Sequence, residues 1–351
     1  MKKLLCALFA LMICVCFCAC ERRVFDIGDK RDAKLTVHFI DVGQGDCILM
    51  ESGGEFVLID SGERDYSDRV TDYIKEQGAN KLSYVIATHP HSDHVGGMRS
   101  ILNSIGADNF ITKESDSDTY AWTKLLKTVE EKGIQYFDAE VGDSYTFGEA
   151  EFTIMGPISD SYEEYNSASV VTKVTCGDIS FLLTGDSDNV SNNEMMDAGE
   201  NLRADVLKLG HHGSNDATSS RFLQAVDPMF AVISCGKNND YGHPHKETMD
   251  RLSLIGCQTF RTDTQGTIVA ETDGTKLRIT TAFDDAGGNY TSGDKRHDIS
   301  LLNPVGNKSS MLFHDPICEG VRTMNPEHMV ELSSREEAIE QGYAPCPVCN
   351  P

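Results

Sequence analysis

A short loop that holds three histidines and one aspartate constrains this chain more than any other feature of its sequence. The loop runs Thr88-His89-Pro90-His91-Ser92-Asp93-His94 and follows an apolar stretch at residues 84–87 that is typical of a buried strand. Imidazole and carboxylate groups are the usual ligands of catalytic zinc. His89 and His91 can face one ion, while Asp93 and His94 can reach a second. The loop therefore predicts a metal centre in preference to a polar surface loop.

Three later loops add candidate residues to this centre. Asp186 ends the run Leu182-Leu183-Thr184-Gly185-Asp186 and can bridge two ions, although a Gly-Asp pair after a strand is most often a turn. The adjacent His211 and His212 point to different sides of the chain, so one can bind metal while the other contacts substrate. His243 lies in Tyr241-Gly242-His243-Pro244-His245, which is equally compatible with a loop that caps the next helix.

The spacing of apolar residues predicts two strand-rich halves with helices between them. In the first half we expect strands at 35–40, 47–51, 56–59 and 84–87, and helices at 67–77, 94–103 and 119–132. In the second half we expect strands at 145–155, 170–175, 179–184, 229–234, 259–261, 266–271 and 276–280, and helices at 219–225 and 245–255. This order favours an α/β sandwich over residues 34–283. Residues 284–310 are rich in Gly, Asn, Ser and Asp, which predicts a linker to a small segment at 311–351.

The first twenty residues have the composition of an export signal. Lys2 and Lys3 precede an apolar run at residues 4–18, which is shorter than the ~20 apolar residues of a spanning helix. The ending Phe17-Cys18-Ala19-Cys20 resembles a bacterial lipobox, although such boxes prefer leucine where Phe17 stands. We expect a signal peptide at 1–20 and a lipid anchor on Cys20 that holds the protein outside the cell membrane. A secreted form and an uncleaved anchor are the alternatives.

The chain is strongly acidic, with a formal net charge of −24. Proteins that hold nucleic acid mainly by charge are basic, so this value argues against sequence-independent coating of DNA. Bound metal ions can still dominate the local field of an acidic hydrolase. Cleavage of a phosphate ester at a metal centre is therefore compatible with the charge.

The ordered motifs resemble the metallo-β-lactamase superfamily, and more closely the hydrolase domain of the ComEC-like competence proteins. Besides the loop at 88–94, the matching segments are Asp41-Val42-Gly43-Gln44-Gly45-Asp46, Ile59-Asp60-Ser61-Gly62, Leu183-Thr184-Gly185-Asp186, His211-His212-Gly213-Ser214 and Gly242-His243-Pro244. They fall within residues 34–283 in the order found in that family. The resemblance implies a hydrolase with a four-layer αββα sandwich and metal ions at one edge of its two sheets.

The resemblance also implies a role for each candidate residue. The metal ligands would be His89 and His91 for the first ion, Asp93, His94 and His212 for the second, and Asp186 between them. His211 would contact phosphate, and His243 would lie at the substrate rim. Asp93 would also orient the attacking water, which two cations ~3.5–4 Å apart activate in such sites.

One ligand departs from the wider superfamily. Many members supply a third histidine to the first ion, whereas the corresponding stretch here is Tyr165-Asn166-Ser167-Ala168-Ser169. Asn166 is the nearest candidate, and asparagine is a poor zinc ligand. The first ion is therefore expected to bind loosely or to be manganese, which suits oxygen ligands. The expected cofactors are two Zn²⁺ or Mn²⁺ ions.

The C-terminal segment carries a second set of soft ligands: His314, Cys318, Cys346 and Cys349. Four such groups suit a closed tetrahedral zinc, and a segment of ~40 residues needs a metal for much of its folding energy. We therefore expect one structural Zn²⁺, with disulfides as the alternative in an exported protein. Residues 311–351 also resemble the zinc-binding module of the DNA-repair protein Ada, which has cysteine where His314 stands.

The leading hypothesis is an exported phosphodiesterase or nuclease that acts on DNA. The alternatives are hydrolysis of another phosphoester, such as phosphocholine on a wall polymer, and a non-catalytic DNA-binding or DNA-uptake protein. The complete ligand set argues against the non-catalytic alternative. A β-lactam hydrolase is compatible with the fold alone, which does not fix function. The expected partners are DNA or another phosphoester and the membrane, and no protein partner is predicted.

Overall fold

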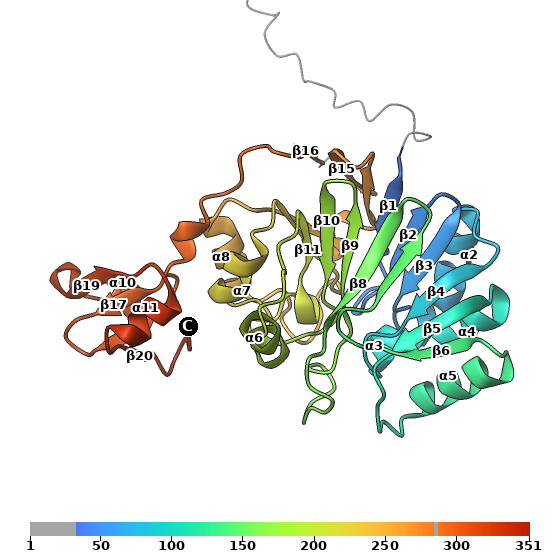
Figure 1. The fold of residues 1–351 in the computed structure, drawn as a ribbon, viewed down its shortest axis with the longest axis horizontal. Helices are drawn as coiled ribbons and strands as arrows, with labels where there is room; N and C mark the ends of the chain where they lie inside the picture. Colours follow the sequence, from blue (N-terminus) through green and yellow to red (C-terminus); the bar gives the residue numbers. More distant parts are fainter. Residues whose placement is uncertain (1–32, 284–286) are drawn as a thin grey trace, which may run out of the picture.

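A computed structural model describes residues 33–283 and 287–351. The predicted signal peptide and the lipidation site at Cys20 lie outside the described residues. Figure 1 shows two central sheets, flanked by helices, with a small C-terminal module at one end of the molecule. Among the described residues, every helix is too short or too polar to cross a bilayer.

One central sheet has nine strands and is built mainly from the first half of the chain. In spatial order they are β16 (Gly288–Thr291), β15 (Lys276–Thr281), β14 (Ile268–Thr272), β1 (Leu35–Phe39), β2 (Ile48–Ser52), β3 (Glu55–Ile59), β4 (Leu82–Ile86), β5 (Ala107–Thr112) and β6 (Gln135–Asp138). The strands from β3 to β6 are parallel, and the others pair antiparallel.

The second central sheet has seven strands, all from residues 144–261. In spatial order they are β13 (Gln258–Arg261), β12 (Phe230–Ile233), β11 (Val206–Lys208), β10 (Ile179–Leu183), β9 (Val171–Cys176), β8 (Ala150–Gly156) and β7 (Ser144–Phe147). The strands from β10 to β13 are parallel. Each sheet therefore has one block of parallel strands whose carboxyl ends can carry a site.

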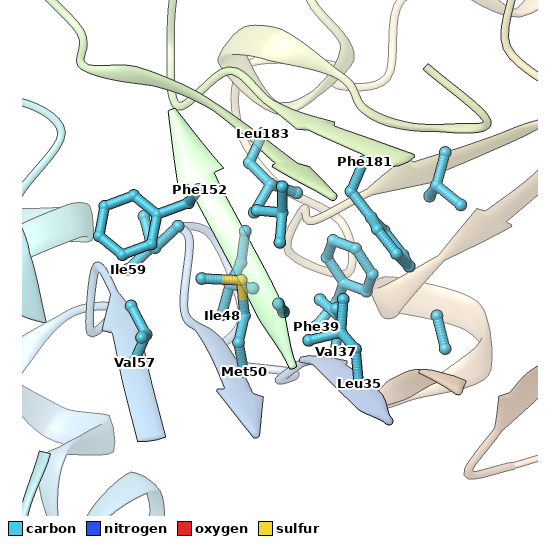
Figure 2. Close-up of a cluster of buried hydrophobic side chains, with 14 of the residues drawn as sticks. Leu35, Val37, Phe39, Ile48, Met50, Val57, Ile59, Phe152, Phe181 and Leu183 are labelled. Carbon is cyan, nitrogen blue, oxygen red and sulfur yellow. The ribbon is translucent and has the colours of Figure 1, made fainter. Parts of the chain in front are cut away.

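The largest hydrophobic cluster fills the space between the two sheets (Figure 2). Leu35, Val37 and Phe39 alternate along β1, so all three point to the same face and are fully buried. Phe152 of β8 and Phe181 of β10 approach this cluster from the other sheet. Burial on this scale is the main force that holds two sheets face to face.

Helices cover the outer face of each sheet and complete four layers. The nine-stranded sheet is covered by α2 (Ser67–Glu76), α3 (Ser92–Val95), α4 (Met98–Ser104) and α5 (Tyr120–Glu131). The seven-stranded sheet is covered by α6 (Asn189–Asp197), α7 (Ser220–Val226) and α8 (Lys246–Leu254). The short helices η2 (Arg64–Tyr66), η3 (Gly210–Gly213), α9 (Thr262–Gln265) and η4 (Ile299–Leu302) lie in connections. The predicted αββα sandwich is confirmed.

The C-terminal module has its own four-stranded sheet, in the order β19 (Met329–Glu331), β17 (Val305–Asn307), β18 (Leu312–His314) and β20 (Ala344–Pro345). Its helices are α10 (Glu319–Arg322), η5 (Pro326–His328) and α11 (Arg335–Glu340). The segment that composition predicts to be a linker, residues 284–310, contributes β16 to the large sheet and β17 to this one. β16 joins the large sheet because Tyr290 is buried in the core between the two sheets.

Candidate metal centre

The polar loops singled out in the sequence meet where the parallel strands of both sheets end. The loop with His89, His91, Asp93 and His94 follows β4, and Asp186 follows β10. His211 and His212 follow β11, and His243 lies in the loop after β12. Ligand sites form at the carboxyl ends of such strands because the loops there converge.

Four of these side chains form one compact group: Asp93, His94, Asp186 and His212. One potential ligand atom from each lies within 4.8 Å of the others. The His212 Nε2 atom lies 3.1 Å from Asp93 Oδ2 and 3.5 Å from Asp186 Oδ2. The His94 Nε2 atom lies 3.3 Å from Asp186 Oδ2. Two imidazoles and two carboxylates from opposite sheets thus surround one point.

The buried carboxylate of Asp60, at the end of β3, orients His94. Its Oδ2 atom lies 2.7 Å from His94 Nδ1 and accepts a hydrogen bond from the Thr88 hydroxyl at 2.6 Å, while its Oδ1 atom accepts one from the Thr88 amide at 2.9 Å. This contact places the His94 ring proton on Nδ1 and leaves the lone pair of Nε2 facing the other ligands. A carboxylate behind a histidine is the usual support of a metal ligand.

His212 is oriented in the same sense by the second sheet. Its Nδ1 atom lies 3.0 Å from the carbonyl oxygen of Ser234, which can only accept a hydrogen bond, so Nε2 again presents a lone pair. Both His211 and His212 have left-handed backbones, with φ of 45° and 55°. Such conformations are costly for residues other than glycine and cluster at functional sites.

The charges in this group fit a divalent cation. Among the described residues, His94 Nε2 and Asp186 Oδ1 are buried without a hydrogen-bond partner, and buried polar atoms without partners are costly. Burial alone would lower the pKa of His94, but Asp186, Asp60 and Asp93 raise that pKa well above its usual value. Against the same effect of burial, chiefly Asp186 raises the pKa of His212 to about 9. The carboxylates that stabilise protonated imidazoles here would equally stabilise a metal ion bound to Nε2 in place of those protons.

His89 and His91 form a pair beside this group, since His89 Nε2 lies 3.9 Å from Asp186 Oδ2. The His89 Nε2 atom lies 2.9 Å from His91 Nδ1, while its Nδ1 atom lies 3.1 Å from the Thr88 hydroxyl. Burial first, and then the charge of His94, lower the pKa of His89 well below its usual value. Two facing ring nitrogens can share a cation or a proton. Among the described residues, no group of three imidazole, carboxylate or thiol ligands within 4.8 Å includes this pair.

Asn166, the candidate weak ligand, contacts His211. Its Nδ2 atom lies 3.3 Å from His211 Nε2, and its buried Oδ1 atom has no hydrogen-bond partner among the described residues. The other ring nitrogen of His211 lies 3.3 Å from Asp216 Oδ1. Asp216 thus fixes the ring proton of His211 on Nδ1 and turns Nε2 toward Asn166.

A pocket of about 320 Å³ opens over this group. Its walls are formed by Gln44, His91, Ser92, Asp93, Asn166, Asp186, His211, His212, Tyr241 and His243. The His243 ring lies 5.3 Å from the His211 ring and stacks on Tyr241 at 5.6 Å. Burial and the neighbouring imidazoles of His211 and His212 lower the pKa of His243 to about 4, so it is neutral at pH 7.

Two glycines allow the loops to approach this closely. A Cβ atom on Gly45, which has a φ of 134°, would lie 2.2 Å from the backbone oxygen of Asp93. A Cβ atom on Gly185, which has a φ of 51°, would lie 2.9 Å from Thr88. Larger residues at either position would push the loop of Asp93 or that of Asp186 out of place.

A second ligand cluster lies in the C-terminal module. Ligand atoms of His314, Cys318, Cys346 and Cys349 all lie within 4.8 Å of one another. The amide of Asp315 donates to Cys349 Sγ at 3.4 Å, and the amide of Val348 donates to Cys346 Sγ at 3.5 Å. His314 Nδ1 is buried without a partner among the described residues. This donor set fits a tetrahedral zinc ion.

The sequence of the whole sandwich can be compared with known families. Residues 40–237 match the family model described as the metallo-beta-lactamase superfamily, which covers more than half of the chain. The chain belongs to the metallo-β-lactamase superfamily. Its members are metal-dependent hydrolases, so the family implies a divalent metal at the group of Asp93, His94, Asp186 and His212.

Two curated relatives of this metallo-β-lactamase protein are ComEC-like competence proteins. The chain is 30% identical to ComE operon protein 3 of Bacillus subtilis over 66% of the present chain. It is 28% identical to competence protein ComA of Neisseria gonorrhoeae over 68% of the present chain. It spans about a third of each relative, 32% in both cases. A solved structure, the metallo-beta-lactamase fold protein YhfI from Bacillus subtilis, covers 68% of this chain and 99% of its own, with 15% identity and a TM-score of 0.48.

The sequence motifs gave no role to three residues that hold the ligands in place. Asp60 and Asp46 stand in quoted motifs, but their contacts with His94 and His212 emerge only in the fold. Lys208 lies in the apolar stretch Val206-Leu207-Lys208-Leu209, yet its ammonium group is fully buried beside Asp46. A lysine inside an otherwise apolar strand was the available signal, because buried charges need a partner.

Proposed function

We propose that this chain is an exported phosphodiesterase that cleaves DNA. The observation that carries the proposal is the position of His211 and His243, which line the same open pocket as the group of Asp93, Asp186 and His212. A phosphodiester presents anionic oxygens to which both a cation and imidazole N–H groups can bind. The competence proteins among the relatives support a nucleic acid as the substrate.

Within this proposal, each side chain has a defined task. Zn²⁺ or Mn²⁺ ions would supply positive charge for the phosphate oxygens and would lower the pKa of water. Asp93 has the most exposed carboxylate of the ligand group, and its Oδ2 atom can accept a hydrogen bond from the attacking water. His211, positioned by Asp216, can donate from Nε2 to a phosphate oxygen when that nitrogen is protonated. Neutral His243 offers one further N–H donor at the rim.

A substrate panel tests the proposal directly. Purified protein with Zn²⁺ or Mn²⁺ would be assayed on single-stranded DNA, duplex DNA, bis-p-nitrophenyl phosphate and a phosphocholine ester. We expect turnover of DNA and the loss of it in His91→Ala and in Asp186→Ala. A preference for the phosphocholine ester would replace DNA as the substrate. Wild-type turnover in both variants would show that the assigned residues are not the site.

Export and membrane attachment are part of the same proposal. They rest on the charged and apolar pattern of residues 1–20 and on the position of Cys20, which follows Ala19. Metabolic labelling with a radioactive fatty acid should mark the wild-type protein and not Cys20→Ala. Recovery of both forms from the culture medium without label would favour a secreted protein.

A further inference from the structure

A second groove opens next to the candidate metal pocket, and its walls carry positive charge. Its volume is about 340 Å³, and it is lined by parts of η2, α3, α4 and α5. The lining includes the side chains of Glu63, Arg64, Ser92, Arg99, Tyr120 and Lys124. Neither the metal ligands nor the proposed chemistry uses these residues, apart from the position of Ser92.

The groove adjoins the metal pocket. Ser92 lines both, and it is followed directly by the candidate ligand Asp93. The His91–Asp93 segment therefore forms one wall between the two spaces. A nucleic-acid strand with one phosphate over Asp93 would therefore have its neighbouring phosphate groups near the groove.

The cations in this groove lack carboxylate partners, although the chain has a net charge of −24. Several other exposed cations are paired, as Lys34 is with Glu149 at 3.1 Å. No carboxylate oxygen of the described residues lies within 4.0 Å of the side-chain nitrogens of Arg64, Arg99 or Lys124. Unpaired cations that line one groove form a local site for an anion.

The carboxylate in the groove lining is already engaged. Glu63 Oε1 accepts a hydrogen bond from Ser92 Oγ at 2.7 Å. Even with the negative charge of Glu63, the lining keeps an excess of positive charge from Arg64, Arg99 and Lys124. A polyanion is therefore the class of ligand that this groove favours.

An aromatic side chain stands at the same groove. Tyr120 is 67% exposed, although a ring of this size is usually covered. The Lys124 ammonium group lies 5.5 Å from the centre of the Tyr120 ring. A positive groove with an exposed ring is the arrangement by which proteins hold single-stranded nucleic acids, because unpaired bases stack on the ring.

We propose that this groove binds the single DNA strand beside the phosphate that is cleaved. Arg64, Arg99 and Lys124 would contact backbone phosphates, and Tyr120 would stack on one base. This inference rests on the proposed function and adds to it a preference for single strands over duplex, whose bases are already stacked.

The test compares two triple variants that change the net charge equally. Arg64→Gln, Arg99→Gln, Lys124→Gln removes the groove cations, whereas Lys132→Gln, Lys295→Gln, Lys308→Gln removes exposed cations that line neither space. Each would be assayed on an oligonucleotide of about 16 nucleotides and on bis-p-nitrophenyl phosphate. For the groove variant we expect the ratio of the two kcat/KM values to fall about tenfold or more. The salt dependence of its oligonucleotide KM should also fall, by about two in the log–log slope.

The control variant should keep the wild-type ratio and slope. Equal losses in both variants, or no loss in either, would overturn the groove assignment. Tyr120→Ala should raise the oligonucleotide KM about fivefold, and it should have less effect on a strand that lacks bases. Equal effects on both strands would remove the stacking contact from the proposal. Preference for duplex in the wild-type protein would contradict the single-strand assignment.

Failure of the proposed function can be recognised separately. If wild-type protein cleaves neither substrate, fluorescence anisotropy of a labelled single strand at low salt still measures binding. Weaker binding by the groove variant than by the control variant would support the groove as a polyanion site. Equal binding by both would overturn it.

Discussion

The ammonium group of Lys208 lies 2.6 Å from the carboxylate of Asp46, and both side chains are buried beside His212. Lys208 ends β11 in one sheet, while Asp46 lies in the loop between β1 and β2 of the other. Burial would raise the pKa of Asp46, but Lys208 lowers it below its usual value. The ion pair therefore joins the two sheets behind the candidate metal group.

Lys208→Met should destabilise the protein by ~3–5 kcal/mol, because it leaves Asp46 buried without a counter-charge. The double variant Lys208→Met, Asp46→Asn should recover part of this loss, since neither member of the pair is then a buried, unpaired charge. Urea unfolding measures the free energy of unfolding of both variants. Lys81→Met, which breaks the exposed pair with Asp108, should cost ~0–1 kcal/mol. A similar small cost for Lys208→Met would show that the pair is not needed.

Asp60→Asn should weaken metal binding or turnover roughly 10- to 100-fold. The change keeps the size of the side chain but removes the negative charge that His94 Nδ1 faces at 2.7 Å. Competition with a chelator gives the affinity, and the DNA assay gives kcat. Asp65→Asn, an exposed neighbour on η2, is the matched control and should behave as wild type. Wild-type values for Asp60→Asn would contradict the supporting role.

Cys346→Ser, Cys349→Ser should lose one tightly bound zinc ion, because two of four ligands that lie within 4.8 Å disappear. Metal analysis of the purified protein measures the loss. Cys176→Ser, which changes a buried cysteine of β9, should keep the zinc. If zinc stoichiometry is unchanged and the unreduced, unfolded wild-type protein has two fewer titratable thiols than the reduced protein, the module holds a disulfide instead.

Asp315→Asn should loosen the C-terminal module from the sandwich. Asp315 Oδ2 lies 3.0 Å from Arg251 Nε of α8 and accepts a hydrogen bond from Ser220 of α7 at 2.8 Å. The change leaves the buried Arg251 without its counter-charge, at a cost of ~3–5 kcal/mol. Limited proteolysis should then release the module earlier than in Arg322→Gln, which breaks an exposed pair with Asp250. Equal digestion rates would contradict the contact.

Alkaline pH should lower the stability through buried thiols. Burial raises the pKa of Cys257 from 9.0 to about 12, so the folded state favours the neutral thiol. The stability that the buried neutral thiol contributes is fully present below pH 9 and is lost as the pH rises toward 12. Urea unfolding between pH 8.5 and 10.5 should show a shallower decline for Cys257→Ala than for wild type. Identical slopes would place the effect elsewhere.

The regular strands could be predicted because their patterns are strict. The alternation of Leu35, Val37 and Phe39 predicts a strand at 35–40, and β1 occupies Leu35–Phe39. β5 (Ala107–Thr112) is not predicted, because Asp108 and Asn109 interrupt its apolar pattern. The helix α6 (Asn189–Asp197) also escapes prediction, since its buried face consists of Ser191, Asn192 and Met195.

The candidate ligands were visible because they stand close together in short motifs. The residues that orient them were not, because their contacts depend on which strands are neighbours. Asp60 meets His94 only because β3 and β4 pair in parallel, and Lys208 meets Asp46 across 162 residues. The groove with Arg64 and Lys124 likewise joins two separate helices, η2 and α5. None of these three contacts leaves a pattern in the sequence that names both partners, although a lysine in an apolar stretch marks Lys208 itself.

The candidate metal group takes two ligands from each half of the sandwich, Asp93 and His94 from one and Asp186 and His212 from the other. A cation held there would fasten the halves to each other, as any ligand that binds only the native state adds to its stability. Copies that lack the ion would open more often at this edge and be degraded sooner. The abundance of the protein would then follow the metal supply of its surroundings, even before catalysis is considered.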